Sequence, residues 1–393
     1  MAKIFKQMTR LIRVLQVIGR ADRGGAETWL VHVLRNIDPN QVKMDFLVHS
    51  RIAGAYDAEI RKCGARIIVC EGHRNVLRQW RGLREAQHQY GPYDIVHSHV
   101  DYYGGVIALL AWLVGIRTRI TNSHNNSESV DREATLSRRL YLQIMRVLIR
   151  VFSTAGLGTG PAAAIVLFGE RWRCDSRWRV IPACVCLSGF RQGHDRRQVR
   201  AAMGIEQDAI VVGHVGRFVE QKNHSFLIQL AERLAVRDGR VRFLLVGGGP
   251  LRDPIEAAVR ERGLGDHFII LSPRDDVPRL MLGAMDYFLF PSHYEGLGLA
   301  LVEAQAAGLR CLASTAIPPE AIAVPSLVRQ KALADGPEAW ADAILQHLNE
   351  PPPLSQPEAL RMVEKRFDIR GNAAQLAELY MSLGANRHEA PAL

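Results

Sequence analysis

Two glutamates, Glu295 and Glu303, stand eight residues apart around a glycine-rich turn in the stretch PSHYEGLGLALVEAQAAG. The apolar run just before it, residues 285–290, predicts a buried strand, and a helix is predicted to begin near Leu299. In an open parallel sheet, ligands bind beyond the carboxyl ends of the strands. A helix N-terminus at that place also presents free N–H groups to anions. This spacing therefore favours a site for an anionic, hydroxylated ligand.

Each part of this stretch can contribute a different contact. Glu295, in the loop, can accept hydrogen bonds from sugar hydroxyls, and Glu303, farther along the helix, can hold a ribose diol with both oxygens. A carboxylate two turns into a helix is ordinarily a surface charge, but the apolar neighbours of Glu303 indicate that it is held near the sheet. Backbone N–H groups would come from the residues between them: Gly296, Leu297 and Gly298.

Two cations lie five residues apart in the stretch GRFVEQKNHSFL, between another predicted strand and its helix. Arg217 and Lys222 would stand over the N-terminus of that helix, which begins near Asn223 and His224. Two fixed cations at such a place suit a diphosphate. Lys222 and Glu295 are both expected in exposed loops, so replacing either by Ala is expected to remove most turnover without unfolding the chain.

Adjacent glycines follow two further predicted strands. Gly24 and Gly25 precede a helix near the N-terminus, and Gly247, Gly248 and Gly249 follow a strand in the second half. Glycine lets a backbone approach a bulky anion closely and adopts positive φ without strain. Neither stretch is the G-x-G-x-x-G of a dinucleotide site, and a plain turn remains the alternative for Gly24 and Gly25.

The elements that must position these residues alternate along the whole chain, as strand-length apolar runs and helix-length segments. This pattern is typical of parallel sheets covered on both faces, and two such sets predict two doubly wound α/β domains. The boundary is expected where the pattern resets, at residues 182–197, which gives domains of residues 1–188 and 189–371. A last helix at about residues 372–388 is expected to pack back on the first domain. The predicted strands are residues 12–18, 43–50, 65–72, 93–99, 118–123, 153–160, 178–182, 209–216, 241–248, 267–272, 286–292 and 310–314.

Positive charge is concentrated in the first half of the chain, whose net charge is +10 over 393 residues. Residues 1–188 carry 27 Lys and Arg against 15 Asp and Glu, whereas residues 189–393 carry 23 against 25. Such a basic half can meet nucleic acid, an anionic membrane or an anionic substrate. No nucleic-acid-binding motif is present, which disfavours the first. Arginines beside apolar residues at 137–152 predict an amphipathic helix, which either lies on anionic lipid headgroups or packs on the core with a solvated basic face.

Features of targeting and redox chemistry indicate a cytosolic protein. The first predicted strand lacks the cleavage site of a signal peptide, and the longest apolar run, residues 104–116, is too short to span a bilayer and reads as a buried helix. Six cysteines form no C-x-x-C pair and no metal-ligand spacing. No Asp-x-Asp metal signature stands in a suitable loop, and Asp275 and Asp276 fit a capping role at a helix start. We therefore expect neither a metal nor another cofactor.

Four stretches in this order resemble the retaining nucleotide-sugar glycosyltransferases of family 4: GRFVEQKNHSFLIQL, LLVGGGPL, RDDVPRLM and PSHYEGLGLALVEAQAAG. The N-terminal stretches RGGAETWLVHVLRNI, DIVHSH and SHNN are similar to the acceptor-side half of the exopolysaccharide and lipopolysaccharide branch. The resemblance extends from about residue 14 to residue 370. It implies the GT-B fold, in which two Rossmann-like domains face each other across a cleft.

The resemblance also implies a role for each matching residue. Arg217 and Lys222 would neutralise the donor diphosphate as the leaving group departs. Glu295 would hold the donor sugar and Glu303 the nucleotide ribose. The backbone at Pro273 and Arg274 would meet the base, with Gly248 close to the nucleotide, and Gly24 and Gly25 would approach the diphosphate on domain closure. His124, in SHNN, would lie near the donor sugar and acceptor, whereas a structural role is as well supported for His97 and His99 as a catalytic one.

The function implied is a hexosyltransferase that moves a sugar with retention, without a metal, onto a lipid-linked or cell-surface glycan precursor. The donor would be a nucleotide sugar, with a UDP-sugar as the first choice. The enzyme would work in the cytoplasm or peripherally on the inner face of the cell membrane. Retention usually needs a carboxylate nucleophile, and no carboxylate is placed for that, so reaction on one face of the sugar is implied instead.

One departure keeps an alternative open. The family commonly has Asn-Gly-x-Asp after the last strand of the first domain, where this chain reads IPACVC at residues 181–186. A catalytically degenerate member that docks to a membrane or a partner enzyme would fit this loss. A phosphorylase on the same architecture would need a cofactor lysine, and the second half has only three lysines, Lys222, Lys331 and Lys365.

Overall fold

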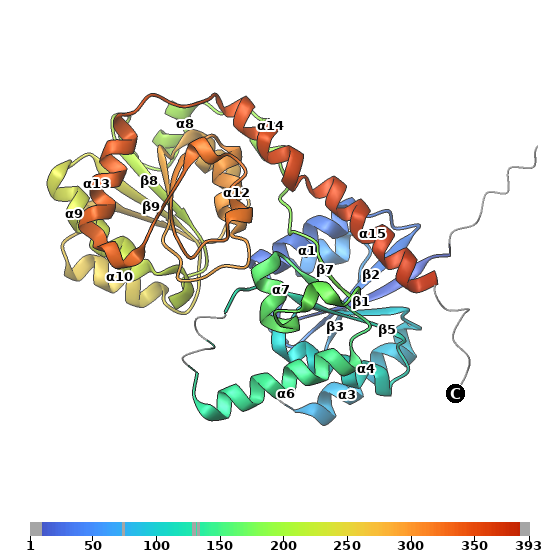
Figure 1. The fold of residues 1–393 in the computed structure, drawn as a ribbon. Helices are drawn as coiled ribbons and strands as arrows, with labels where there is room; N and C mark the ends of the chain where they lie inside the picture. The colour runs from blue at the N-terminus through green and yellow to red at the C-terminus, as the bar shows by residue number, and fades with distance from the viewer. Residues whose placement is uncertain (1–9, 73–74, 128–130, 132–133, 386–393) are drawn as a thin grey trace, which may run out of the picture. The chain divides into compact units, whose positions relative to one another are not determined.

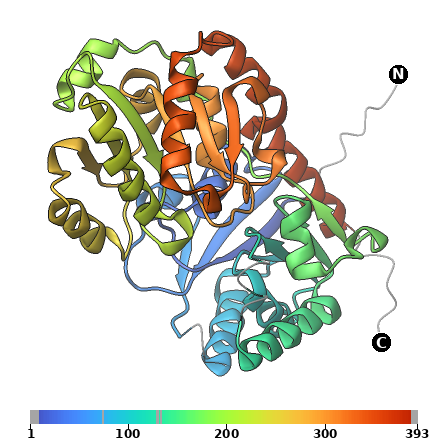
Figure 2. The same ribbon diagram turned by 60° about the vertical axis from the view of Figure 1, so that its left-hand side comes forward.

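The computed structural model describes residues 10–72, 75–127, 131 and 134–385. The chain divides into two compact units: residues 1–182 with 369–393, and residues 183–368. In both units helices cover both faces of a parallel sheet (Figure 1; Figure 2). The two Rossmann-like domains expected from the sequence are therefore confirmed. The chain passes from the first unit to the second between Pro182 and Ala183 and returns between Asp368 and Ile369.

The first unit is built on a seven-stranded sheet of order β3-β2-β1-β4-β5-β6-β7. Its strands are β1 (Ile12–Ile18), β2 (Val42–Val48), β3 (Ile67–Val69), β4 (Ile95–Ser98), β5 (Thr118–Ser123), β6 (Ala155–Gly158) and β7 (Trp178–Val180). Its helices are α1 (Gly25–Asn36), α2 (Asp57–Lys62), α3 (Val76–Glu85), α4 (Gly104–Leu113), α6 (Leu136–Phe152), α7 (Pro161–Phe168) and α15 (Ile369–Ala385). The strand order reverses between β1 and β4, which marks the position where such sheets bind ligands.

The second unit has a six-stranded sheet of order β10-β9-β8-β11-β12-β13. Its strands are β8 (Ile210–Val215), β9 (Val241–Val246), β10 (Phe268–Leu271), β11 (Tyr287–Phe290), β12 (Arg310–Ser314) and β13 (Val328–Lys331). Its helices are α8 (Arg196–Ala202), α9 (His224–Arg237), α10 (Arg252–Glu261), α11 (Val277–Gly283), α12 (Leu299–Ala306), α13 (Gly336–Asn349) and α14 (Gln356–Phe367). Here the order reverses between β8 and β11.

All twelve predicted strands are present, and the buried helix expected within residues 104–116 is α4, whose residues are almost all buried. β13 is not among the predicted strands, because it is a short, mostly polar strand in which only Val328 is buried. The last predicted helix corresponds to α15, and residues 386–388 of that prediction lie outside the described residues. α15 packs against α1 and β1, so the end of the chain completes the first unit (Figure 2).

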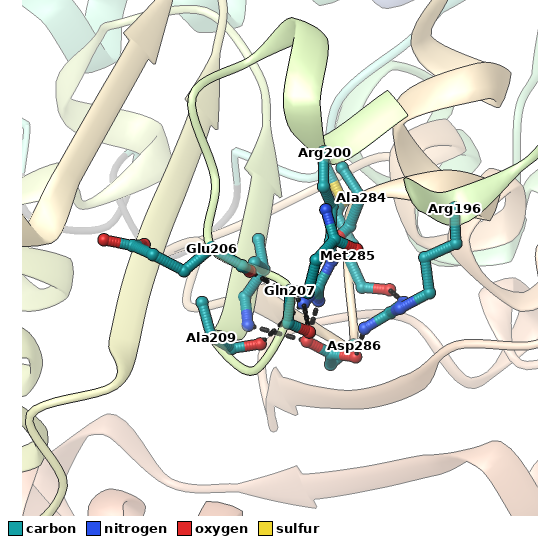
Figure 3. Close-up of polar contacts among 9 residues, drawn as sticks. Arg196, Arg200, Glu206, Gln207, Ala209, Ala284, Met285 and Asp286 are labelled. Carbon is teal, nitrogen blue, oxygen red and sulfur yellow. Dashed lines mark hydrogen bonds and ion pairs between the residues drawn. The ribbon is translucent and has the colours of Figure 1, made fainter. Parts of the chain in front are cut away.

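A buried arginine holds α8 to the sheet of the second unit (Figure 3). Arg200 is fully buried, and its guanidinium donates to the Asp286 carboxylate at 2.6 Å. Asp286 stands just before β11 and also accepts the backbone N–H of Val211, in β8, at 2.7 Å. The guanidinium further donates to four backbone carbonyl oxygens, those of Glu206, Gln207, Ala209 and Ala284. This cluster joins α8 to β8 and β11, the two strands that flank the reversal of the sheet.

Candidate functional site

Four loops gather at one edge of the second sheet. They follow β8, β9, β10 and β11, which are neighbours in the order β10-β9-β8-β11. Parallel strands end at the same edge, so residues 216–223, 247–251, 272–276 and 291–298 lie beside one another there. Direct contacts join them, since the N–H of His293 donates to the carbonyl of Gln221 and the amide of Gln221 donates to the carbonyl of Tyr294.

Lys222 and Glu295 form an ion pair across two of these loops. The Lys222 Nζ lies 2.5 Å from the Glu295 Oε1 and 4.8 Å from the centre of the Phe290 ring. The side chains of Lys222 and Glu295 are 15% and 8% exposed. The expectation that both stand in exposed loops is therefore wrong, because the pairing of the loops and the Phe290 ring cover them. Removing one charge would leave the other buried without a partner.

Three successive backbone N–H groups next to this pair have no acceptor. Glu295, Gly296, Leu297 and Gly298 are all buried. No described residue accepts a hydrogen bond from the N–H groups of Gly296, Leu297 or Gly298. Buried N–H groups are almost always paired in native proteins, and a run of free N–H groups is a receptor for anions and hydroxyl oxygens. Gly298 has φ +92°, and a Cβ there would lie 2.9 Å from the Phe290 ring, so only glycine suits this turn.

Arg217 contributes a free cation to the same edge. Its side chain is exposed, and its guanidinium makes no hydrogen bond or ion pair with any described residue. Arg217 and Lys222 follow β8 as expected, and α9 begins at His224. The structure thus places one paired and one unpaired cation, among the described residues, in the loop that follows β8.

The glycines after β9 mostly serve loop packing. A Cβ at Gly247 would lie 1.9 Å from the carbonyl oxygen of Gly216, and one at Gly249 would lie 2.5 Å from the carbonyl oxygen of Phe218. Gly248 differs, because its added Cβ would meet just the Pro273 ring, at 3.0 Å. At Gly247 and Gly249, the backbone that comes close is therefore that of the β8–α9 loop. Gly248 remains the candidate for contact with a ligand.

Pro273 and Arg274 stand in the loop between β10 and α11. Pro273 is exposed, and the Arg274 guanidinium is engaged with the Asp276 carboxylate, to which Arg279 also donates at 3.3 Å. Asp276 precedes α11 but accepts no capping hydrogen bond. The capping role expected for it is therefore wrong, because the two arginines occupy its oxygens. The Arg274 side chain is thus engaged within its own loop.

Glu303 lies on the second turn of α12. Its side chain is half-buried, and no described residue donates a hydrogen bond to its carboxylate. Burial raises the pKa of Glu303 to about 7, since removal from water disfavours the charged form. This carboxylate has no donor among the described residues and is partly removed from solvent, so it could accept two hydrogen bonds from a diol.

In the first unit, Gly24 precedes α1 and Gly25 begins it. A Cβ at Gly25 would meet nothing within 4 Å, whereas one at Gly24 would lie 2.2 Å from the Glu27 Oε2. An anion approaching Gly24 would therefore meet this carboxylate, which stands in the first turn of α1.

Three histidines of the first unit, His97, His99 and His124, lie at the carboxyl ends of β4 and β5 and form one cluster. The His99 Nδ1 lies 2.9 Å from the His124 Nε2, and the ring centroids of His97 and His99 are 4.1 Å apart. Burial lowers the pKa of His97 and of His124 to about 3 and that of His99 well below its usual value. All three rings are therefore neutral near pH 7.

Sequence reasoning missed the residues that complete this cluster. Gln16 of β1 lies opposite His97 in the sheet and bonds to His99, and Tyr380 of α15 bonds to both Gln16 and His97. Gln16 could have been identified as a candidate, because it is a polar residue inside the apolar run IRVLQVI. Tyr380 carries no such signal, because it is one of several large residues on an ordinary helix.

Within residues 10–385 as described, no group of three or more His, Cys, Asp or Glu is arranged to hold a metal ion. Among the described helices, none combines the length and apolar character needed to cross a membrane.

Comparisons with known proteins agree on one family. The family model for "Glycosyl transferases group 1" matches residues 195–366. The "Putative glycosyltransferase EpsF" of Bacillus subtilis (strain 168) is 35% identical over 371 residues, which cover 94% of this chain and 96% of that protein. A "UDP-Gal:alpha-D-GlcNAc-diphosphoundecaprenol alpha-1,3-galactosyltransferase" of Escherichia coli is 26% identical over 228 residues, 56% of this chain and 58% of that protein. The solved structure of Anabaena Alr3699/HepE in complex with UDP and glucose has a TM-score of 0.77 at 17% identity, covers 94% of this chain and 100% of that chain, and shows the likeness of fold alone.

Proposed function

The chain belongs to the group 1 glycosyl transferases and has the GT-B fold, and from this premise we propose that it moves a hexose from a nucleoside diphosphate onto a glycan precursor. The observation that carries the proposal is the run of free N–H groups at Gly296, Leu297 and Gly298 beside the Lys222–Glu295 pair. This edge offers donors and cations for a diphosphate and a carboxylate for sugar hydroxyls.

The donor would be held in parts by the four loops. Arg217 and Lys222 would neutralise the diphosphate and stabilise the charge of the leaving group, without a metal ion. Glu295 would bind the donor sugar, Glu303 the ribose, and the backbone at Gly248, Pro273 and Arg274 the base. The Lys222 ammonium would then be shared between Glu295 and the phosphate.

The donor base, the acceptor and the stereochemistry are finer parts of the proposal. A UDP-sugar is favoured because the Anabaena structure of the same fold holds UDP and glucose. A lipid-linked acceptor is favoured by the Escherichia coli relative, whose name specifies a diphosphoundecaprenol-linked acceptor. Retention is proposed as a reaction on one face of the sugar, with His124, Gly24 and Gly25 of the first unit contributing near the acceptor and diphosphate.

A thermal-shift screen with UDP, GDP, ADP and their sugar conjugates tests the donor site. Ligand at about 100 times its dissociation constant adds roughly 2.7 kcal/mol to the free energy of unfolding, so the transition temperature is expected to rise with one nucleotide family, UDP first. Release of nucleoside diphosphate that depends on an added acceptor then distinguishes a transferase from a hydrolase. If no nucleotide raised the transition temperature, the assignment of the donor site would be wrong, and a protein that docks to a membrane or a partner enzyme would be the better interpretation.

Glu303 should make donor affinity depend on pH. Its pKa of about 7 means that the carboxylate is about one-tenth ionised at pH 6 and about nine-tenths at pH 8. A ribose diol donates to the ionised form, so the affinity for a UDP-sugar is expected to rise about ninefold between these pH values. A UDP-sugar is used because its phosphates do not titrate in this range.

The matched variant Glu303→Gln keeps the shape of the side chain and removes the titration. Its affinity is expected to be lower at pH 8 and to change little with pH, as measured by titration calorimetry. The wild-type carboxyl also favours the folded state at low pH, and this contribution is lost as pH rises through about 7. An identical pH profile in the two proteins would remove Glu303 from the ribose site.

The first unit also has a surface suited to an anionic membrane, and we place the enzyme peripherally on the inner face of the cell membrane. Helices α3, α4 and α6 lie side by side (Figure 1). The prediction of an amphipathic helix is confirmed by α6, which buries Leu142, Met145 and Ile149. Its outward side carries exposed apolar residues at helical spacing, which are Leu136, Leu140, Ile144, Val147 and Val151.

Neighbouring residues extend this apolar stripe and add charge. Val76 and Leu77 of α3 and Trp112 and Leu113 of α4 are exposed as well. Exposed arginines accompany them, at positions 78, 81, 84, 117, 138, 139 and 150. Apolar side chains in the acyl boundary with arginines at the headgroups are the pattern of a helix that lies in a membrane interface.

Vesicle sedimentation tests whether this surface binds membranes. The wild-type protein is expected to bind vesicles that contain anionic lipid more tightly than neutral ones, with affinity falling as salt rises. Val147→Asp should weaken binding about tenfold or more, because it places a charge on the apolar stripe. Val236→Asp, at an 89% exposed position on α9, is the control and should bind like wild type. Equal partitioning onto neutral and anionic vesicles would contradict the proposal.

A further inference from the structure

A continuous chain of hydrogen bonds runs from the last helix of the protein to His124. The Tyr380 hydroxyl lies 3.0 Å from the Gln16 Nε2 and 2.7 Å from the His97 Nδ1. The Gln16 Oε1 lies 2.8 Å from the His99 Nε2, and the His99 Nδ1 lies 2.9 Å from the His124 Nε2. Tyr380 and Gln16 are thus coupled to His124 although 364 residues separate them from each other.

The chain is shielded from water. Gln16, His97 and Tyr380 are fully buried, and His99 is 8% exposed. With the rings neutral, each imidazole has one nitrogen that donates and one that accepts. Every link therefore constrains the next, and the proton positions along the chain depend on one another.

The orientation of Gln16 gives this chain a direction. Its carbonyl oxygen faces the His99 Nε2, so that nitrogen carries the hydrogen and the His99 Nδ1 accepts. His124 must then donate from Nε2, which leaves a lone pair on its Nδ1. The structure places the Asn122 amide nitrogen, itself a donor, 2.8 Å from the same Nε2, so this tautomer of His124 requires the two interchangeable ends of the Asn122 amide to be swapped. No described residue hydrogen-bonds to the His124 Nδ1.

Two further contacts hold the His124 ring in place. The backbone N–H of His124 donates to the Asp101 carboxylate at 3.0 Å. The Trp29 ring lies edge-on to His124 at 5.9 Å between centroids, and its Nε1 donates to Asn372 of α15 at 2.7 Å. α15 therefore reaches the cluster through Asn372 as well as through Tyr380.

We propose that Tyr380 is a positioning residue that acts through Gln16 and His99 to hold His124 in one tautomer, with Nδ1 free to accept a hydrogen bond from a hydroxyl of the sugar donor or acceptor. The part concerning substrate rests on the function proposed above, whereas the tautomer itself does not. Tyr380 touches no substrate in this scheme, and its effect passes entirely through the histidines.

Long-range ¹H–¹⁵N NMR of the full chain, labelled in histidine, observes the tautomers without any substrate. Signals are assigned with His97→Gln, His99→Asn and His124→Ala variants. In the wild-type protein, His99 and His124 are each expected to be a single neutral tautomer with hydrogen on Nε2. In Tyr380→Phe, and in Gln16→Met as a second variant, their ¹⁵N shifts are expected to move toward a mixture. Unchanged shifts in both variants would overturn the proposal.

A double-mutant cycle on sugar transfer then separates positioning from general stability. Tyr380→Phe is expected to lower kcat about tenfold, leave the thermal shift by the donor unchanged, and cause no further loss in a His124→Ala background. Tyr287→Phe is the matched control, since it removes a buried tyrosine–histidine hydrogen bond of 2.9 Å to His347 in the second unit. An equal loss in both backgrounds would overturn the proposal. A wild-type protein that transfers no sugar would reject the proposed function, while the NMR result would still decide the tautomer.

Discussion

Replacing Lys222 with Met is expected to lower kcat/KM for sugar transfer by about 100- to 1,000-fold. Methionine keeps an unbranched chain against the Phe290 ring but cannot neutralise the diphosphate. Loss of one group that stabilises developing charge in a water-poor site ordinarily costs this much. The measurement is the initial rate of acceptor-dependent nucleoside-diphosphate release. Lys365→Met, at an exposed lysine on α14, should retain wild-type activity.

Activity and stability must be separated, because Lys222 is paired with the buried Glu295. Lys222→Met alone should lower the free energy of unfolding by about 2 kcal/mol, less than the 3–5 kcal/mol of a fully buried pair because 15% of the lysine side chain is exposed. The double variant Lys222→Met with Glu295→Gln removes both charges. It should regain much of the stability without regaining activity.

The outcome of that double variant decides the role of the pair. If activity returned with stability, Lys222 would serve the fold alone and would not bind the diphosphate. Near-normal turnover by the single variant would likewise remove Lys222 from the site. That replacing Lys222 or Glu295 by Ala removes most turnover without unfolding the chain stays a prediction, although the exposed loops given as its reason are not found.

Arg200→Met is expected to lower the free energy of unfolding of the second unit by about 3–5 kcal/mol. The substitution removes the buried donor of the Asp286 carboxylate, which keeps Arg196 and the Val211 N–H, and it leaves four backbone carbonyl oxygens short of a donor inside the unit. For a unit of this size, such a loss lowers the transition temperature by roughly 10 °C, as followed by circular dichroism.

The control is a second arginine in an ion pair that water can reach. Arg233 pairs with Glu338 at 3.6 Å, and both side chains are more than half exposed. Arg233→Met should change stability by no more than about 1 kcal/mol. In an Asp286→Asn background, Arg200→Met should cost less than in wild type, since the carboxylate that pairs with Arg200 is gone. An Arg200→Met protein as stable as the Arg233→Met control would show that the buried cluster contributes no net stability.

The strand pattern of this chain was readable from its sequence because buried parallel strands are short, continuous and apolar. Runs such as FLLV in β9 and YFLF in β11 are apolar throughout, as expected for strands buried on both faces of a sheet. The edge strand β13 could not be predicted in this way. An edge strand pairs with one neighbour and tolerates polar residues, here Arg329, Gln330 and Lys331. The loops that carry the candidate site were located for the same reason, because each follows a readable strand.

Which side chains meet in those loops was decided by the order of the strands. β8 and β11 are neighbours although an α-β-α-β-α segment (α9, β9, α10, β10 and α11) separates them in sequence, and this brings Lys222 within a hydrogen bond of Glu295, 73 residues away. The same close packing assigned Gly247 and Gly249 to loop contacts rather than to a ligand. Burial and pairing of this kind depend on distances between segments that no local pattern records.

The residue types therefore determined the two wound domains and the chemistry available at their loops, because hydrophobic period and turn residues act locally. Tertiary structure decided the partners and protonation of those groups. It placed Tyr380 of α15 against Gln16 and His97, and it removed Glu303 from water far enough to raise its pKa to about 7. The physical reason is that desolvation and hydrogen-bond direction are properties of a packed environment, and that environment forms only when distant segments of the chain come together.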